Sequence, residues 1–149
     1  MRLAKNISFY LIIAFIICII SKYLKSEFLL KYLSENIIGL LLTLLAINTA
    51  TLGLIASKIQ DMLSKYPKMS FKKTTKEMKF SLTEQVVLII VSVIALIILN
   101  SSLIQFDYKE LVFNTILVGV LIYSISILWD TGKAVFIIID LIEEKNNKE

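Results

Sequence analysis

The side chains that usually carry enzyme chemistry are scarce in this sequence. It has no histidine, and its one cysteine, Cys18, lies inside an apolar run. Zinc sites, nucleophilic triads and phosphate-binding glycine-rich loops therefore lack their residues. No pair of acidic residues falls within the apolar runs, and Asp130 lies only at the edge of one, which argues against a proton-coupled carrier. We expect a protein that is not an enzyme and that uses no metal or cofactor.

The composition predicts a membrane protein. The chain has 149 residues, of which 57% are hydrophobic, and its mean hydropathy is +0.80. Only helices and closed barrels satisfy their backbone groups in lipid, and the apolar runs here are continuous rather than alternating. The sequence therefore predicts an all-α, polytopic membrane protein.

Four apolar runs are candidates for membrane spans, at about residues 7–24, 37–57, 86–102 and 111–129. The basic start followed by an apolar run also fits a signal peptide. Because SKYLKSEF follows without a small-x-small cleavage site, we expect an uncleaved first span. The mixed-charge segment 21–36 is amphipathic and is expected to lie on the membrane surface.

The positions of lysine and arginine predict the orientation. With the N-terminus inside, 12 of these residues fall on the inner side and 4 on the outer side. This is a clear positive-inside bias. We therefore expect a multi-pass protein of the bacterial inner membrane with both termini in the cytoplasm.

Small residues in the second run form a seam along one side of a helix. They recur at steps of four and three, at Gly39, Thr43, Ala46, Ala50, Gly53 and Ser57. In lipid, helices associate where small side chains let their backbones approach. We therefore expect this seam to pack helices together and to support a homo-oligomer.

Three polar residues inside the runs allow two interpretations. Asn48 lies nearly opposite the seam, Thr51 follows one turn later, and Asn114 belongs to the fourth run. Such residues are typical of hydrogen bonds between helices, which is the preferred interpretation. The alternative is that they line a conduction path.

The connection at residues 58–85 is strongly basic and is divided by Pro67. Ser81 and Glu84 match a capping box, so a helix break near Ser81 is an open alternative. The lysines that could dock a partner or lipid are Lys65, Lys68, Lys72, Lys73, Lys76 and Lys79. They fix the topology and contact anionic headgroups, or they bind an acidic, soluble cytoplasmic protein. Direct nucleic-acid binding is not expected, because no aromatic stacking platform accompanies the charge.

The C-terminal segment 130–149 keeps an amphipathic pattern. Asp130, Lys133 and Asp140 share one side, while Phe136 and Ile139 belong to the apolar remainder. The segment either lies in the inner leaflet or prolongs the fourth helix and packs with the extensions of its neighbours. We prefer the second alternative, which gives a four-transmembrane-helix bundle whose helices extend into the cytoplasm.

This architecture resembles the membrane subunits of two-gene anti-phage defence systems, in particular the Kiwa membrane component. The resemblance lies in the architecture of the whole chain and not in a motif, so it assigns no residues. It implies a homo-oligomeric membrane sensor that holds a cytoplasmic DNA-binding effector. We accordingly expect a non-enzymatic scaffold or sensor. The alternative is a pore-forming or membrane-disrupting effector, such as a channel or a holin-like protein.

Overall fold

The chain folds into four long helices joined by short connections. The computed structural model describes residues 2–67 and 69–146, without the side chains of residues 2–6, 141, 142 and 144–146. The helices are α1 (Arg2–Tyr23), α2 (Phe28–Lys65), α3 (Lys72–Asn100) and α4 (Lys109–Asn146). No strand occurs in the described residues. The predicted all-α class is therefore confirmed.

Three of these helices are long and apolar enough to cross a membrane. They are α2, α3 and the Lys109–Asp140 part of α4. The described apolar part of α1, Ile7–Tyr23, is shorter. Large apolar side chains such as Phe9, Ile97 and Leu54 point outward from their helices, as expected where lipid surrounds the bundle. The fold is therefore consistent with a helical membrane protein.

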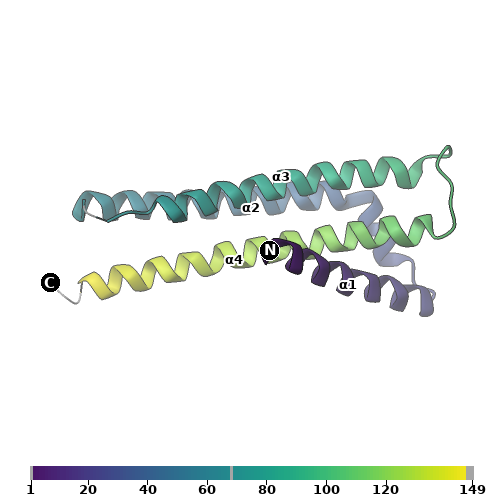
Figure 1. Ribbon diagram of the computed structural model, residues 1–149, viewed down its shortest axis with the longest axis horizontal. Coiled ribbons are helices and arrows are strands. Elements are labelled where there is room, and N and C mark those ends of the chain that lie inside the picture. Colours follow the sequence, from purple (N-terminus) through teal and green to yellow (C-terminus); the bar gives the residue numbers. More distant parts are fainter. Residues whose placement is uncertain (1, 68, 147–149) are drawn as a thin grey trace.

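The helices form an elongated bundle with two different halves. In Figure 1, α2, α3 and α4 run along the long axis, whereas α1 lies beside only one half of α4. Helix α4 packs against each of the other three helices, and α1 makes extensive contact with α4 alone. We call the part that α1 does not cover the stub. It comprises residues 57–65 of α2, 72–79 of α3 and 130–146 of α4.

Each half has its own apolar core. The core beside α1 joins all four helices through buried residues that include Ala14, Ile37, Ala95 and Leu117. The stub core joins three helices through the residues Leu52, Ile55, Ile59, Met62 and Ile138, with Met78 and Leu82 of α3 packed against them. The stub is therefore a packed structure and not three separate extensions.

The connection between α1 and α2 differs from the sequence prediction. Lys25 adopts a positive φ of 52°, and the Ser26 N–H donates to the Ser21 carbonyl, which closes α1 with a Schellman-type turn. Helix α2 then begins at Phe28 and continues into the predicted second span. Because Leu33 is buried in the bundle core, residues 28–36 belong to α2 and do not form a separate surface segment.

Two other predicted boundaries also change. Helix α3 runs without a break through Ser81, so the capping-box alternative is wrong. It ends at Asn100, two residues before the end of the predicted span 86–102. Helix α4 instead continues unbroken past Trp129. Its residue Ile138 lies in the stub core, which is the preferred alternative for the C-terminal segment.

Candidate functional site

Asn48 links α2 to α3 inside the bundle. Its Nδ2 donates to Gln85 Oε1 at 2.8 Å and to Ser81 Oγ at 3.1 Å. Asn48 is 0% exposed and Gln85 is 2% exposed. Of the two interpretations of Asn48, the structure supports a hydrogen bond between helices.

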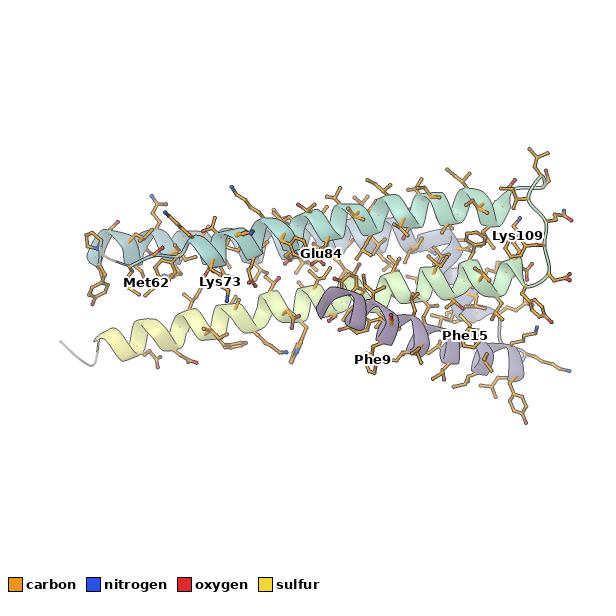
Figure 2. All side chains as sticks on the ribbon, in the orientation of Figure 1. Phe9, Phe15, Met62, Lys73, Glu84 and Lys109 are labelled. Atoms are coloured by element: carbon orange, nitrogen blue, oxygen red, sulfur yellow. The ribbon has the colours of Figure 1, made fainter. Side chains whose placement is uncertain are left out.

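A second set of polar contacts links α3, α4 and α1. The Tyr123 hydroxyl on α4 donates to the Glu84 carboxylate on α3 at 2.5 Å. The Tyr123 ring lies 5.5 Å from the ring of Tyr10 on α1. The Tyr10 hydroxyl in turn lies 2.5 Å from Ser126 Oγ on α4. Figure 2 shows Glu84 on α3, close to the point where α1 begins beside α4.

Several buried polar atoms near these contacts have no protein partner. Among the described side chains they are Asn48 Oδ1, Gln85 Nε2, Ser92 Oγ and Ser124 Oγ. Ser124 follows Tyr123, and Gln85 follows Glu84, so two of the four adjoin the Glu84–Tyr123 pair in sequence. Leaving a buried donor or acceptor unsatisfied costs about 1–3 kcal/mol.

The sequence prediction missed Glu84 and Gln85 because it began the third span at residue 86. Packing places Gln85 beside Asn48, near the middle of the apolar stretch of α2. Glu84 precedes the apolar run of α3 and is half-buried, so the expectation that no acidic residue lies at mid-membrane stays a prediction. The buried face of α3 contains Gln85, Ser92 and Ala95. Gln85 lies seven residues, or about two helical turns, before Ser92 and therefore on the same face of α3. Following the face of Ser92 and Ala95 back by two turns would have identified it.

The seam of small residues lies outside the chain's own bundle. Gly39, Thr43, Ala46, Ala50, Gly53 and Ser57 are all exposed. A Cβ added at Gly39 or Gly53 would meet no atom within 4 Å. The buried residues of α2, among them Leu41, Asn48 and Leu52, lie on the opposite side. The seam therefore does not pack against the other helices of its own chain, and packing against another molecule stays a prediction.

The other predicted polar residues in the spans do not join Asn48. Thr51 is half-buried, and its hydroxyl donates to the Ile47 carbonyl of its own helix. Asn114 is half-buried on α4. It lies nine residues from Tyr123, about 13 Å along a helix. The structure therefore does not bring these three residues together.

The predicted docking lysines gather on the stub. Lys72, Lys76 and Lys79 line a groove of about 510 Å³ whose floor includes Ile59 and Phe71. Lys65 and Lys73 are exposed outside this lining, and Lys68 lies outside the described residues. The ion pairs of the described side chains are Lys58–Asp61 and Lys133–Asp130. The lysines that line the groove thus form no ion pair with an acidic side chain that the structure describes.

The predicted C-terminal residues lie mostly on the outside of the stub. Asp130 and Lys133 pair at 3.4 Å, and both are exposed, as is Asp140. Phe136 is 69% exposed and Ile139 is 44% exposed, whereas Ile138 is buried. The stub therefore presents lysines and apolar side chains on its surface, a combination that suits a protein partner.

Replacing Asn48 by Leu is expected to destabilise the bundle by about 1–3 kcal/mol, because Gln85 and Ser81 lose their partner. The double variant Asn48→Leu with Gln85→Leu should recover part of this loss. Such pairs in membrane proteins couple by roughly 0.6–1.7 kcal/mol. The measurement is helix loss by circular dichroism during SDS titration of the protein in micelles. Thr49→Leu is the control, because Thr49 is exposed and bonds to its own helix; an equal loss there would contradict the assignment.

No protein-family model, curated protein or solved structure matches this chain, so its function must be argued from its own residues and their geometry.

Proposed function

We propose that this chain is a non-enzymatic, four-span membrane protein that self-associates through α2 and presents the stub to a soluble protein. The observation that carries the proposal is the position of the seam, whose six small residues all face away from the chain's own helices. A membrane helix with a small-residue face is suited to close packing against another helix. The occupant that we propose is a second copy of α2.

The levels of the helix ends support four spans. The Tyr123–Glu84 and Tyr10–Ser126 contacts place Lys5, Lys79 and Trp129 near one level. From there α3 runs about 21 residues to Asn100 and α4 about 20 residues to Lys109, or roughly 30 Å, whereas α1 runs about 17 residues to Lys22, or roughly 26 Å. Aromatic and lysine residues at both ends are typical of the two membrane interfaces. This supports α1 as a fourth span, with both termini and the stub on the basic, cytoplasmic side of a bacterial inner membrane.

The stub supports the partner half of the proposal. Its groove is lined by apolar residues such as Ile59 and Phe71 and by three lysines that form no ion pair among the described side chains. An acidic protein surface with apolar side chains complements both features. We propose such a cytoplasmic protein as the partner, in a sensor or scaffold that serves anti-phage defence. The role in anti-phage defence is proposed only from the architectural resemblance to the Kiwa membrane component.

Cysteine cross-linking tests the self-association. In a Cys18→Ala background, we expect Ala46→Cys and Ala50→Cys to form cross-linked dimers in native membranes. Val87→Cys is the matched control: it is exposed on α3 and lies two residues from Gln85, the partner of Asn48. Equal cross-linking at Val87 would show that the cross-links arise from random collisions in the membrane. No cross-linking at Ala46 or Ala50 would contradict the seam interface.

The same purified protein tests the partner. Mass photometry after gentle extraction should show an oligomer that carries one identified soluble protein. Reversal of the lysines by Lys72→Glu, Lys73→Glu and Lys76→Glu should release that protein and leave the cross-linked oligomer intact. If the substitutions release the soluble protein and also dissociate the oligomer, the docking surface is not separate from the oligomer interface.

A pore receives less support from this geometry. Asn48 is bonded to Gln85, and Thr51 to its own helix. The core beside α1 is apolar across all four helices, which closes the far half of the bundle of one chain. Ion flux in planar bilayers that Asn48→Leu abolishes would overturn the scaffold in favour of a pore.

A further inference from the structure

The groove on the stub carries its positive charge in one row. It lies between the end of α2 and the start of α3, and its lining includes Lys72, Lys76 and Lys79 but no acidic residue. We call these three residues the lysine row. Their steps of four and three place them within about 60° of one another around α3, along about 10.5 Å of its axis. Lys73 is turned away from them by about 60° or more and lies outside the lining.

The described acidic side chains on the same helix segments do not pair with the lysine row. Asp61 on α2 pairs with Lys58 at 3.9 Å, and Glu77 on α3 is exposed outside the groove lining. The other ion pair of the described side chains joins Lys133 to Asp130 on α4. Carboxylates that complement the row are therefore expected from another molecule.

Apolar side chains line the groove beside the lysine row. Ile59 and Leu63 lie one turn apart on α2, and Met69 and Phe71 lie in the connection just before α3. Ile59 is buried in the stub core, but Leu63 is 38% exposed, and Met69 and Phe71 are half-buried. Apolar surface beside charged residues is typical of a contact between proteins.

The position of the groove along the bundle favours a soluble protein over a lipid headgroup. In the proposed orientation, Lys79 lies at the edge of the hydrocarbon core, and the headgroup layer extends about 5–8 Å beyond it. Lys72 lies seven residues, or about 10.5 Å, further out. Asn48 and Gln85 are in contact and thus level. Counting outward from this contact, Leu63 lies 15 residues away and Lys79 lies six, so Leu63 is about 13.5 Å beyond Lys79.

A helix reproduces the spacing of the lysine row better than a strand does. The lysines follow one another at about 6 and 4.5 Å along the axis of α3. Residues on one face of a strand recur about every 6.6 Å, so three of them span about 13 Å. Carboxylates at positions i, i+4 and i+7 of a second helix repeat the row, and apolar residues beside them can contact Leu63 and Phe71. This is the recognition of an amphipathic helix in a groove.

We propose that the groove binds an acidic, amphipathic helix of the soluble partner. This inference rests on the proposed function, which places a soluble protein at the stub, and it adds the element and the charge spacing by which that protein is recognised. The lysine row binds the carboxylates of the helix, and Leu63 and Phe71 contact its apolar side chains. Lys65 and Lys73, which lie outside the groove, contribute only long-range attraction.

The probe that tests the proposal is a stapled helical peptide with glutamates at steps of four, three and four and leucines on either side of them. This pattern presents the spacing of the lysine row in both chain directions. Fluorescence anisotropy is measured with the full chain in phosphatidylcholine nanodiscs, and empty nanodiscs give the baseline. We expect saturable binding that weakens as the salt concentration rises. A peptide of the same composition with its glutamates spread around the helix should bind about tenfold more weakly, and equal binding of the two peptides would overturn the proposal.

Three substitutions at exposed positions locate the peptide. Lys76→Glu should weaken binding about tenfold, because repulsion replaces attraction. Leu63→Ser should weaken it about fivefold through lost apolar contact. Lys73→Glu is the matched control on the same helix and should change the affinity by no more than about twofold. An equal loss in Lys73→Glu, or no loss in Leu63→Ser, would show attraction by net charge alone and overturn the proposal.

Two other occupants of the groove would give different results. Native mass spectrometry could find phosphatidylglycerol bound to the chain, and its loss in Lys76→Glu but not in Lys73→Glu would assign the groove to a lipid. A disulfide between co-expressed Cys18→Ala chains, one with Leu63→Cys and the other with Phe136→Cys, would assign it to α4 of a second copy. Either result would overturn the proposal.

The peptide assay and the proposed function can fail separately, because the assay requires neither the natural partner nor an oligomer. If the patterned peptide binds as expected but no soluble protein co-purifies, the proposed function fails and the specificity of the groove stands. If a soluble protein co-purifies but the two peptides bind equally, only the helix in the groove fails.

Discussion

Substitution of Ile138 by Asp is expected to detach the end of α4 from the stub. Ile138 is 5% exposed and is the residue by which α4 enters the stub core with Leu52, Ile55, Ile59 and Met62. Deleting a buried Ile side chain costs about 2–5 kcal/mol, and Asp adds an unpaired charge. The stub core is small, and α4 contributes one fully buried side chain to it, so separation of the end of α4 relieves the penalty.

Hydrogen exchange measured by mass spectrometry separates this local effect from global unfolding. Protection should be lost in residues 131–146 and retained in residues 111–128, because the second stretch packs in the other core. Phe136→Asp is the matched control, since Phe136 lies two residues away and is 69% exposed. A loss of protection in both variants, or in neither, would contradict the packed stub.

Substitution of Gly119 by Leu is expected to push α1 away from α4. Gly119 is buried, and a Cβ built on it would lie 3.1 Å from Leu11 Cδ2 and 3.6 Å from Ala14 Cβ, both on α1. The end of Leu11 can yield to one methyl group, so Gly119→Ala should be tolerated. Leu adds three more carbons in the same direction. Overpacking of this kind costs about 1–3 kcal/mol, and α1 packs extensively on α4 alone.

An engineered disulfide reports the displacement of α1. The Cys18 side chain contacts that of Thr115 across the α1–α4 interface. Thr115→Cys should therefore oxidise with Cys18 within one chain, and Gly119→Leu should abolish this bond. Gly132→Leu is the control on the same helix, because a Cβ at Gly132 meets nothing within 4 Å. If the disulfide forms equally well with Leu at position 119, α1 does not depend on this close approach.

Local sequence patterns predicted the elements well where one physical cause dominates. Long runs without charge must be helical in lipid, because nothing else satisfies their backbone groups. Pro67 cannot continue a helix, and α2 indeed ends at Lys65, just before it. The same reasoning failed at residues 28–36 and at Ser81, where charged residues suggested a surface segment and a break. Leu33 and Gln85 are buried, and their packing holds both stretches in the continuous helices α2 and α3.

The candidate site was only half visible in the sequence. Asn48 could be singled out because an amide in an apolar run needs a partner. Glu84, Gln85 and Tyr123 could not be assigned to it. Hydropathy gives the position of a residue along its own helix, but it does not show which residues of other helices lie beside it. The Asn48–Gln85 contact joins α2 to α3, and the Glu84–Tyr123 contact joins α3 to α4. Together they fix the positions of these three helices along the bundle axis relative to one another. That alignment buries Gln85 and leaves Glu84 half-buried at the contact between α3 and α4.

By itself, then, the sequence determined that the chain is helical, that its helices are apolar enough for a membrane, and that one side of Gly39–Ser57 is lined with small residues. These properties follow from residue types and their spacing along one helix. Only the tertiary structure decided which side of α2 faces inward. Nine residues, or two and a half turns, separate Gly39 from Asn48, so they lie on opposite faces, and α3 and α4 cover only the face of Asn48. Burying Asn48 gives its amide a partner in Gln85 and leaves the small residues outside.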